Sequence, residues 1–386
     1  MDIDRSGVPG GGRAEGAARR CTSRFRDGEP VSRKVLRRLG AVVLLLVAVA
    51  AAAGFWAWQR YQGFADRPLS SLRPDSQLLV ERGDSLPTVL RKLRGLGVSE
   101  GHQAEWRVLA RELGAAGRLQ VGEYALSPGM SPRDVLLAMR DGRVVRYAFT
   151  ILPGRNIREL RAALARAEPL EQEIAGLDDA ALMAALGQAG QHPEGRFLPE
   201  TYHYTRGDSD LDLLRRAHAA MGRALDEAWA ARNPDSVLET PDQMLTLASI
   251  VEKETGIAEE RARIAGVFER RLKIGMKLQT DPTVIYGLGA AYDGNIRRRD
   301  LETDTPYNTY TRAGLPPTPI AMPGVDALRA VARPDDGDAL YFVALGDGSG
   351  RHAFSRTLAE HNAAVARYLR RYRQTRAAER AATAAQ

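Results

Sequence analysis

The longest apolar run of the chain lies between Gly40 and Trp58 and contains no charged residue. About 20 consecutive apolar residues are enough to cross a bilayer as a helix. We therefore predict a single transmembrane helix over residues 39–60. Basic residues precede the run and aromatic residues end it, as is typical of the two faces of a membrane: Arg33, Lys34, Arg37 and Arg38 on one side, and Phe55, Trp56, Trp58 and Tyr61 on the other.

The basic residues before this run determine the expected orientation. By the positive-inside rule, the N-terminus lies in the cytoplasm and everything after Arg60 lies outside, in a single-pass protein of the cytoplasmic (inner) membrane. The alternative is a signal peptide cleaved within Ala50–Ala53, but the aromatic belt and the long basic leader favour an uncleaved anchor. We predict a disordered cytoplasmic leader over residues 1–38 and a Pro- and Ser-rich linker over 61–77.

Residues 78–152 carry the periodicities of a small α/β module. Strands are predicted at 78–81, 122–126 and 144–151, and helices after Asp84 or Ser85, over 102–113, and after Ser131. A strand, two helices and a strand in this order resemble a LysM-like module, a type that binds glycans. A structural module without a ligand is an equally good interpretation.

The region 153–370 is predicted to be a mixed helical domain with short strands, which makes the whole chain α+β. Its first part, 156–235, is Ala- and Leu-rich and is interrupted at 194–202, whereas short Gly-, Pro-, Thr-, Asn- and Tyr-rich motifs separate the later helices. Such turn residues on a helical scaffold are typical of binding loops. Residues 371–386 are predicted to form a C-terminal tail.

One predicted helix, Leu245–Gly256, places an acid beside apolar residues. Residues three, four and seven positions apart share a helical face, so Glu254 shares a face with Leu247, Ile250 and Val251, while Glu252 falls on another. A partly desolvated Glu holds a proton near neutral pH and is suited to general acid catalysis. The alternative is a surface Glu at the frayed end of an amphipathic helix, which Gly256 terminates as a C′ glycine.

The net charge of +7 does not indicate a nucleic-acid partner. Residues 1–38 contain ten Arg or Lys and five acids, so 10 − 5 = 5 of the seven excess charges precede any predicted domain. No nucleic-acid-binding signature accompanies them. The single cysteine, Cys21, excludes a disulfide within the chain, and no Cys/His spacing indicates zinc. We therefore predict no metal and no cofactor.

Five blocks in the second half of the chain together resemble the signature of the endolytic murein transglycosylases, the YceG-like family. They occur in the family's order and spacing, and the predicted anchor and LysM-like module fit its architecture. The blocks are Ala248–Thr255, Leu278–Gly287, Tyr307–Thr311, Gly314–Pro317 and Leu340–Val343.

This resemblance implies a membrane-anchored enzyme that cuts peptidoglycan strands internally. The bond expected to break is the β-1,4 bond from N-acetylmuramic acid to N-acetylglucosamine, without water, leaving a 1,6-anhydro end. The family's catalytic acid corresponds to Glu254. The resemblance also implies glycan strands as the substrate and peptidoglycan synthases as neighbours.

The chemistry requires only one carboxyl group. Glu254 would protonate the leaving oxygen, the C6 hydroxyl of the muramic acid would attack C1 of its own ring, and the Glu254 carboxylate would take the C6 proton. A hydrolase needs a second carboxylate, and Asp281 is the candidate for it. We favour an Asp-Pro turn or a substrate hydrogen bond for Asp281 over catalysis.

Several polar and aromatic residues of the blocks are predicted to bind sugars by hydrogen bonds or stacking. The alternatives for them are turn capping or a core tyrosine. Arg196 stands where we expect an aromatic residue, which argues against stacking at that position. His352 and His361 are interpreted as structural. The predicted binding residues are Gln279, Thr280, Asp281, Tyr286, Tyr307, Asn308, Thr309 and Tyr310, with Glu200 and Tyr202 as further cleft residues.

Three functions thus remain open from the sequence. The first is a lytic transglycosylase with one catalytic acid. The second is a lysozyme-like hydrolase with a second carboxylate. The third is a non-catalytic membrane-anchored scaffold that binds glycans through the LysM-like module, which the predicted burial of Glu254 disfavours.

Overall fold

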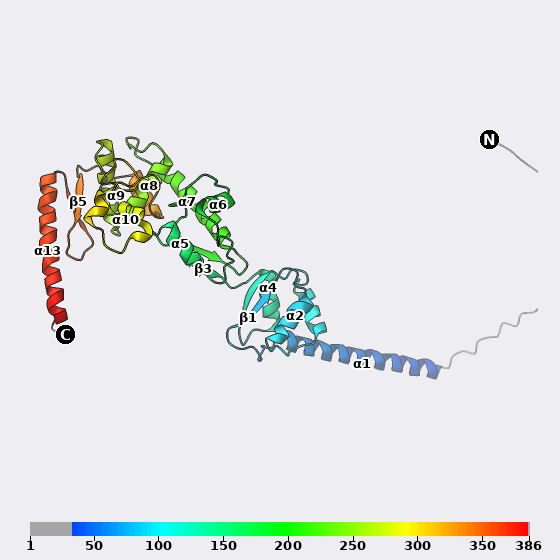
Figure 1. Ribbon diagram of the computed structural model, residues 1–386. Helices are drawn as coiled ribbons and strands as arrows, with labels where there is room; N and C mark the ends of the chain where they lie inside the picture. Colours follow the sequence, from blue (N-terminus) through cyan, green and yellow to red (C-terminus); the bar gives the residue numbers. More distant parts are fainter. Residues whose placement is uncertain (1–32, 385–386) are drawn as a thin grey trace, which may run out of the picture. The chain divides into compact units, whose positions relative to one another are not determined.

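The computed structural model describes residues 33–384, and the chain divides after Ala65 into two compact units (Figure 1). The predicted disordered segment 1–32, with Cys21, lies outside the described residues. Within them, the first unit is a single helix, α1 (Arg33–Ala65). Its part Leu36–Ala65 is long and apolar enough to span a membrane, judged by length and composition.

Helix α1 extends beyond the predicted span 39–60 at both ends. Residues 33–38, predicted as part of the leader, and residues 61–65, predicted as part of the linker, are helical. No proline interrupts the segment, and Pro68 follows shortly after it. The helix therefore continues until the backbone can no longer extend it.

The second unit begins with the predicted small α/β module. Its two strands pair antiparallel, with Ser76 opposite Leu126. Leu69 and Leu72 are buried although the sequence predicted a linker there, because the segment before the first strand packs into the module. The elements are β1 (Ser76–Val80), α2 (Leu86–Gly95), α3 (Gln103–Glu112), β2 (Gly122–Leu126) and α4 (Pro132–Asp141).

The strand predicted at 144–151 does not belong to this small sheet. It is shorter, β3 (Tyr147–Thr150), and pairs antiparallel with β4 (Thr201–Tyr204), which lies in the predicted interruption of the helical region. The segment still contacts the small module at its start, where the Val145 amide donates to the Glu123 carbonyl at 2.7 Å, and the predicted module boundary at 152 stays a prediction. Three helices complete this part: α5 (Ile157–Leu164), α6 (Asp179–Ala185) and α7 (Asp210–Ala230).

The remaining elements surround helix α8 (Pro241–Glu254), which contacts α7, α9, α10 and α12 (Figure 1). Helix α13 packs against the hairpin β5–β6 and continues without a break through most of the predicted tail 371–386. The other elements are α9 (Ala258–Lys273), α10 (Asp281–Leu288), the 3₁₀ turn η1 (Gly289–Ala291), α11 (Arg298–Glu302), α12 (Val325–Ala332), β5 (Tyr341–Ala344), β6 (His352–Ser355) and α13 (Leu358–Ala384).

Helix α8 is buried on all sides rather than on one face. Every residue from Met244 to Val251 is buried, including Thr246 and Ser249. The Ser249 hydroxyl donates to the Thr246 carbonyl and accepts from the Ile320 amide, at 2.7 and 3.0 Å. The predicted distinction between a core face and another face therefore does not hold, because a central helix is covered all round.

The C-terminal end of α8 also differs from the prediction. Thr255 is extended, with φ −148° and ψ 137°, and its hydroxyl accepts from the Ile257 amide at 2.9 Å. Gly256 is absent from the positions with positive φ, so it is not a left-handed C′ glycine. The chain leaves the helix in an extended conformation immediately after Glu254.

Candidate active site

Glu254 is the last residue of α8, at the point where the helix leaves the core. The residue as a whole keeps some exposed surface, but its carboxyl group is enclosed by protein. Burial raises the pKa of this carboxyl and the charge of Asp281 raises it further, whereas the Thr280 hydroxyl, His352 and Arg271 lower it. An enclosed carboxyl with a raised pKa is suited to donate a proton to a bound molecule.

The Thr280 side chain contacts Glu254 directly. It is 2 % exposed, and its hydroxyl donates a hydrogen bond to Glu254 Oε1. The preceding residue, Gln279, is exposed and has a φ of +50°. A left-handed conformation in a residue other than glycine is uncommon and is often found at functional sites. The tight turn at Gln279 brings the Thr280 hydroxyl to the acid.

Thr309 connects the two predicted binding loops to each other. Its hydroxyl accepts from the Thr280 amide at 3.1 Å and bonds the Thr283 hydroxyl at 2.9 Å. Its carbonyl accepts from the Gln279 amide at 3.1 Å. Because Thr309 is buried, it holds the loop that carries Thr280 rather than presenting its own side chain to solvent.

Asp281 begins helix α10 instead of starting a turn, with Thr280 as the N-cap residue and Pro282 in the first turn. Pro is favoured there because its missing N–H would have no helical partner. Asp281 is exposed, and its Oδ1 accepts from the Tyr310 hydroxyl at 2.5 Å. Burial and this bond raise the pKa of Tyr310. The charge of Asp281 in turn raises the pKa of the Glu254 carboxyl.

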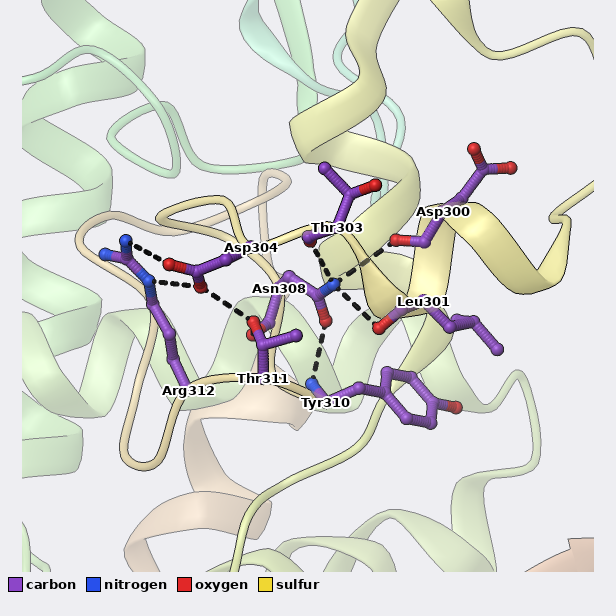
Figure 2. Close-up of polar contacts among 8 residues, drawn as sticks. All are labelled: Asp300, Leu301, Thr303, Asp304, Asn308, Tyr310, Thr311 and Arg312. Carbon is purple, nitrogen blue, oxygen red and sulfur yellow. Dashed lines mark hydrogen bonds and ion pairs between the residues drawn. The ribbon is translucent and has the colours of Figure 1, made fainter.

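Asn308 stabilises the loop before Tyr310 from inside (Figure 2). It is 1 % exposed. Its amide nitrogen donates to the carbonyls of Asp300, Leu301 and Thr303 at 3.2, 3.0 and 2.6 Å, and its oxygen accepts from the Tyr310 amide at 2.9 Å. All these contacts are with backbone, so Asn308 orders the loop on which Tyr310 stands.

The outer part of the same loop is held by an ion pair. Arg312 binds both oxygens of Asp304, at 2.8 and 2.9 Å, and the Thr311 hydroxyl donates to Asp304 at 2.9 Å (Figure 2). These bonds join Asp304 to Thr311 and Arg312 and so tie the start of the loop to its end.

Tyr286 and Tyr307 form an aromatic pair whose hydroxyls have partners other than Glu254. Their ring centroids are 4.9 Å apart at 60°. The Tyr307 hydroxyl bonds Thr318 at 2.8 Å. Burial raises the pKa of Tyr286, and the charge of the buried Glu194 raises it further. The structure thus gathers Thr280, Asp281 and Tyr310 around Glu254 and directs these two tyrosines elsewhere.

Glu200 and Tyr202 belong to a different core from Glu254. Tyr202 is buried in β4, and its hydroxyl donates to the Leu198 carbonyl at 2.8 Å. Glu200 is exposed, and its carbonyl accepts from the Ile151 amide. Among the contacts of the described residues, none joins either residue to Glu254, so their role in a cleft stays a prediction.

Arg196, at the position where an aromatic residue was expected, bonds Asp242 in the first turn of α8 at 2.8 Å. Its side chain therefore braces the start of the helix that ends in Glu254. Glu252 has a comparable role at the other end, since its Oε2 accepts from the Gly324 amide at 3.1 Å, just before α12.

Sequence analysis did not identify two groups that act on the Glu254 carboxyl. Arg271 is buried, and its guanidinium donates to the carbonyls of Leu340 and Leu278 at 2.6 and 2.7 Å. His352, interpreted as structural, pairs through Nδ1 with buried Glu260 at 2.8 Å. Glu260 and His352 are 92 positions apart in the sequence, and no local pattern joins them.

Among the described residues, no group of three or more His, Cys, Asp or Glu side chains is arranged to hold a metal ion.

Comparisons with known proteins agree on one family. The YceG-like family matches residues 78–367. An endolytic murein transglycosylase of Bacillus subtilis (strain 168) is 32% identical over 308 residues, which cover 75% of this chain and 84% of that protein. One of Streptococcus pneumoniae serotype 2 (strain D39 / NCTC 7466) is 34% identical over 155 residues, 39% of this chain but only 28% of that protein.

A crystal structure of a YceG-like protein from Listeria monocytogenes covers 75% of this chain and 98% of its own, with 27% sequence identity and a TM-score of 0.49. The family match alone extends over most of the chain, from the first strand of the small module to helix α13. The chain therefore belongs to the YceG-like family.

Proposed function

We propose that this protein is an endolytic murein transglycosylase that cuts glycan strands of peptidoglycan and leaves 1,6-anhydro-muramic acid ends. The observation that carries this proposal is the enclosed Glu254 carboxyl, whose pKa burial raises. The Bacillus relative, matched over 84% of its length, bears this activity in its name. The resemblance of the five sequence blocks to the family implies that Glu254 corresponds to its catalytic acid.

The proposed reaction uses the Glu254 carboxyl twice. Protonated Glu254 donates to the glycosidic oxygen, and the bond from that oxygen to C1 of the muramic acid breaks. The C6 hydroxyl oxygen of the same sugar bonds to C1, and its proton passes to the Glu254 carboxylate. Attack within one ring has a high effective molarity, and the residue ends in its starting protonation state. No water is consumed.

A lysozyme-like hydrolase is the second candidate, and the position of Asp281 favours it. Its charge raises the pKa of Glu254, so a second carboxylate lies within electrostatic range of the acid. Asp281 is, however, bonded to the Tyr310 hydroxyl, which favours a role in orienting that loop or the substrate.

The products decide between these two reactions. Full-length protein in detergent is incubated with uncrosslinked glycan strands in isotopically labelled water, and the released ends are identified by mass spectrometry. Unlabelled 1,6-anhydro ends support the transglycosylase. Labelled reducing ends would replace it with the hydrolase, and intact strands would leave the scaffold interpretation standing.

The Thr280 hydroxyl should set the pH range of this reaction. Its hydrogen bond lowers the pKa of Glu254, so Thr280→Val should raise that pKa further. Because Glu254 must be protonated to act, activity is lost as pH rises through its pKa, and this limb should move to higher pH. Measuring kcat against pH tests this, with exposed Thr201→Val as the control. A limb that stays in place or moves down would contradict the assignment.

The membrane anchor and its orientation are part of the proposal. Exposed Lys34, Arg37 and Arg38 precede the uncharged run of α1 that begins at Leu39, so by the positive-inside rule we expect the second unit outside the cytoplasmic membrane, where peptidoglycan lies. Protease added to intact spheroplasts should degrade residues after Asp66; full protection would reverse the orientation. Glycan binding by the small module and proximity to peptidoglycan synthases stay predictions.

A further inference from the structure

Glu194 is a buried acid that the proposed reaction does not use. It is 0 % exposed, and both carboxyl oxygens accept from the Ile157 amide at the start of α5, at 3.1 Å each. The Tyr286 hydroxyl from α10 is close enough to act on this carboxyl and lower its pKa. Burying a carboxylate away from water costs free energy unless hydrogen bonds or opposite charges compensate it.

The surroundings of Glu194 bring the pKa of its carboxyl close to neutral pH. Burial raises its pKa to about 7, although the Ile157 amide, the Tyr286 hydroxyl, the Gly195 amide and Arg158 all act to lower it. His192 lies on the same loop, with its Nδ1 accepting from the Glu194 amide at 3.1 Å. Tyr307 is packed behind Tyr286. The charge of Glu194 therefore changes near neutral pH.

Helix α10 joins this buried acid to the candidate active site. Its N-cap residue is Thr280, which donates to Glu254. Tyr286, six residues later, is about 9 Å further along the helix and reaches Glu194. Arg158 lies over the Tyr286 ring at 5.6 Å and against Gly289, where a Cβ would be 2.8 Å from its guanidinium. One short helix thus meets Glu254 through its N-cap residue and Arg158 near its other end.

We propose that Glu194 is a positioning residue for Glu254 that acts through Tyr286 and helix α10. The carboxylate holds the start of α5, from which Arg158 lies over the Tyr286 ring, and this fixes Tyr286 and the distance at which Thr280 meets Glu254. This proposal rests on the proposed function for its kinetic consequences, and on the contacts of α10 alone for its structural ones.

The ionised form of Glu194 is the one that holds Tyr286. A carboxylate is a stronger acceptor for the Tyr286 hydroxyl and the Ile157 amide than a protonated acid. Activity should therefore fall as pH drops through the pKa of Glu194, giving an acidic limb with its midpoint near 7. The alkaline limb belongs to Glu254, so the two acids affect opposite sides of the profile.

The test compares Glu194→Gln, Tyr286→Phe and the double variant with wild type, all full-length. Gln keeps an acceptor for the Ile157 amide and removes the charge. We expect both single variants to lower kcat by roughly 10- to 100-fold with KM little changed, and the double variant to be no worse than the singles. The acidic limb near pH 7 should disappear in Glu194→Gln, while Thr280→Val moves only the alkaline limb.

A matched control is Asp210→Asn. Asp210 is also 0 % exposed and accepts from two backbone amides, those of Glu173 and Ile174, at 2.9 and 3.1 Å, but has no contact with α10 among the described residues. It should retain the wild-type pH profile. Unchanged kcat in Glu194→Gln, multiplying effects in the double variant, or the same loss of the acidic limb in Asp210→Asn would overturn the proposal.

Hydrogen–deuterium exchange at residues 278–288 separates this proposal from the proposed function, because it needs no turnover. Glu194→Gln and Tyr286→Phe should speed exchange there, whereas Asp210→Asn should not. If wild type cut no glycan but exchange changed as expected, the proposed function would fail and the coupling through α10 would stand. If wild type were active but exchange in α10 did not change, the coupling itself would be wrong.

Discussion

Glu254→Gln is expected to lower kcat for glycan cleavage by about 10²–10⁴-fold, the usual contribution of a general acid or base. Gln fits the same space but has no proton to give to the glycosidic oxygen and no carboxylate to take one from the C6 hydroxyl. Release of anhydro ends from uncrosslinked glycan strands measures the effect.

The same substitution should not unfold the protein. Burial raises the pKa of Glu254 above its unfolded value, so the folded state holds the proton more strongly. This stabilisation is present in full at low pH and is lost as pH rises through the folded pKa. Gln carries no charge at any pH, so the thermal unfolding temperature above that range should equal or exceed that of wild type.

Glu252→Gln is the matched control, two residues earlier on α8. Its Oε2 accepts from the Gly324 amide, and Gln keeps an acceptor for that bond. Activity should stay within a few-fold of wild type, since the substitution changes no group that touches the reacting atoms. If Glu252→Gln abolished cleavage and Glu254→Gln did not, the assignment of the acid would be reversed.

Asn308→Ala is expected to destabilise the protein by about 3 kcal/mol or more, because each buried polar group left without a partner costs roughly 1–3 kcal/mol. The substitution leaves three partly buried carbonyls and the Tyr310 amide without the Asn308 side chain. Thr309 and Tyr310 then lose the loop that holds them, so activity should fall as well.

Denaturant unfolding followed by tryptophan fluorescence measures this destabilisation, and limited proteolysis of residues 300–312 shows where the structure opens. Asn295→Ala is the control, since Asn295 is exposed in the same part of the chain and should change stability by less than about 0.5 kcal/mol. Equal unfolding midpoints for the two variants would show that the Asn308 bonds contribute little.

Local patterns in the sequence predicted most individual elements. The strand at 122–126 has the predicted bounds, and the predicted helix after Ser131 is capped by that hydroxyl, which accepts from the Asp134 amide at 3.2 Å. These features depend on residues within one turn of each other. The family was also recognisable, because its blocks are short contiguous segments.

Features that depend on distant residues could not be predicted in this way. Tyr147 pairs with Tyr204, so β3 forms a sheet with β4 and not with the strands of the small module. Thr309 bonds Thr280, 29 positions away, and therefore anchors a loop, although its sequence context predicted contact with sugar. In the sequence Glu194 is an acid before a glycine and carries no motif. Its burial and its interaction with Tyr286 appear only in the folded chain.

Helical periodicity alone does not distinguish Glu254 from Glu252. It groups Glu254 with Leu247, Ile250 and Val251 and places Leu245 and Ala248 on the other face with Glu252, but both of these are equally buried. What separates the two acids is their surroundings: Glu252 bonds a backbone amide, whereas Glu254 lies where the extended Thr255 takes the chain out of the helix and Thr280 meets its carboxyl.

The complete burial of α8 has a consequence for motion. Amides inside a helix covered on all sides exchange with solvent only when most of the protein opens, so those of Met244–Val251 belong to the slowest-exchanging set of the chain. We therefore expect the helix that carries the acid to move little, and accommodation of a long polymer to come from the loops around it rather than from the proton donor.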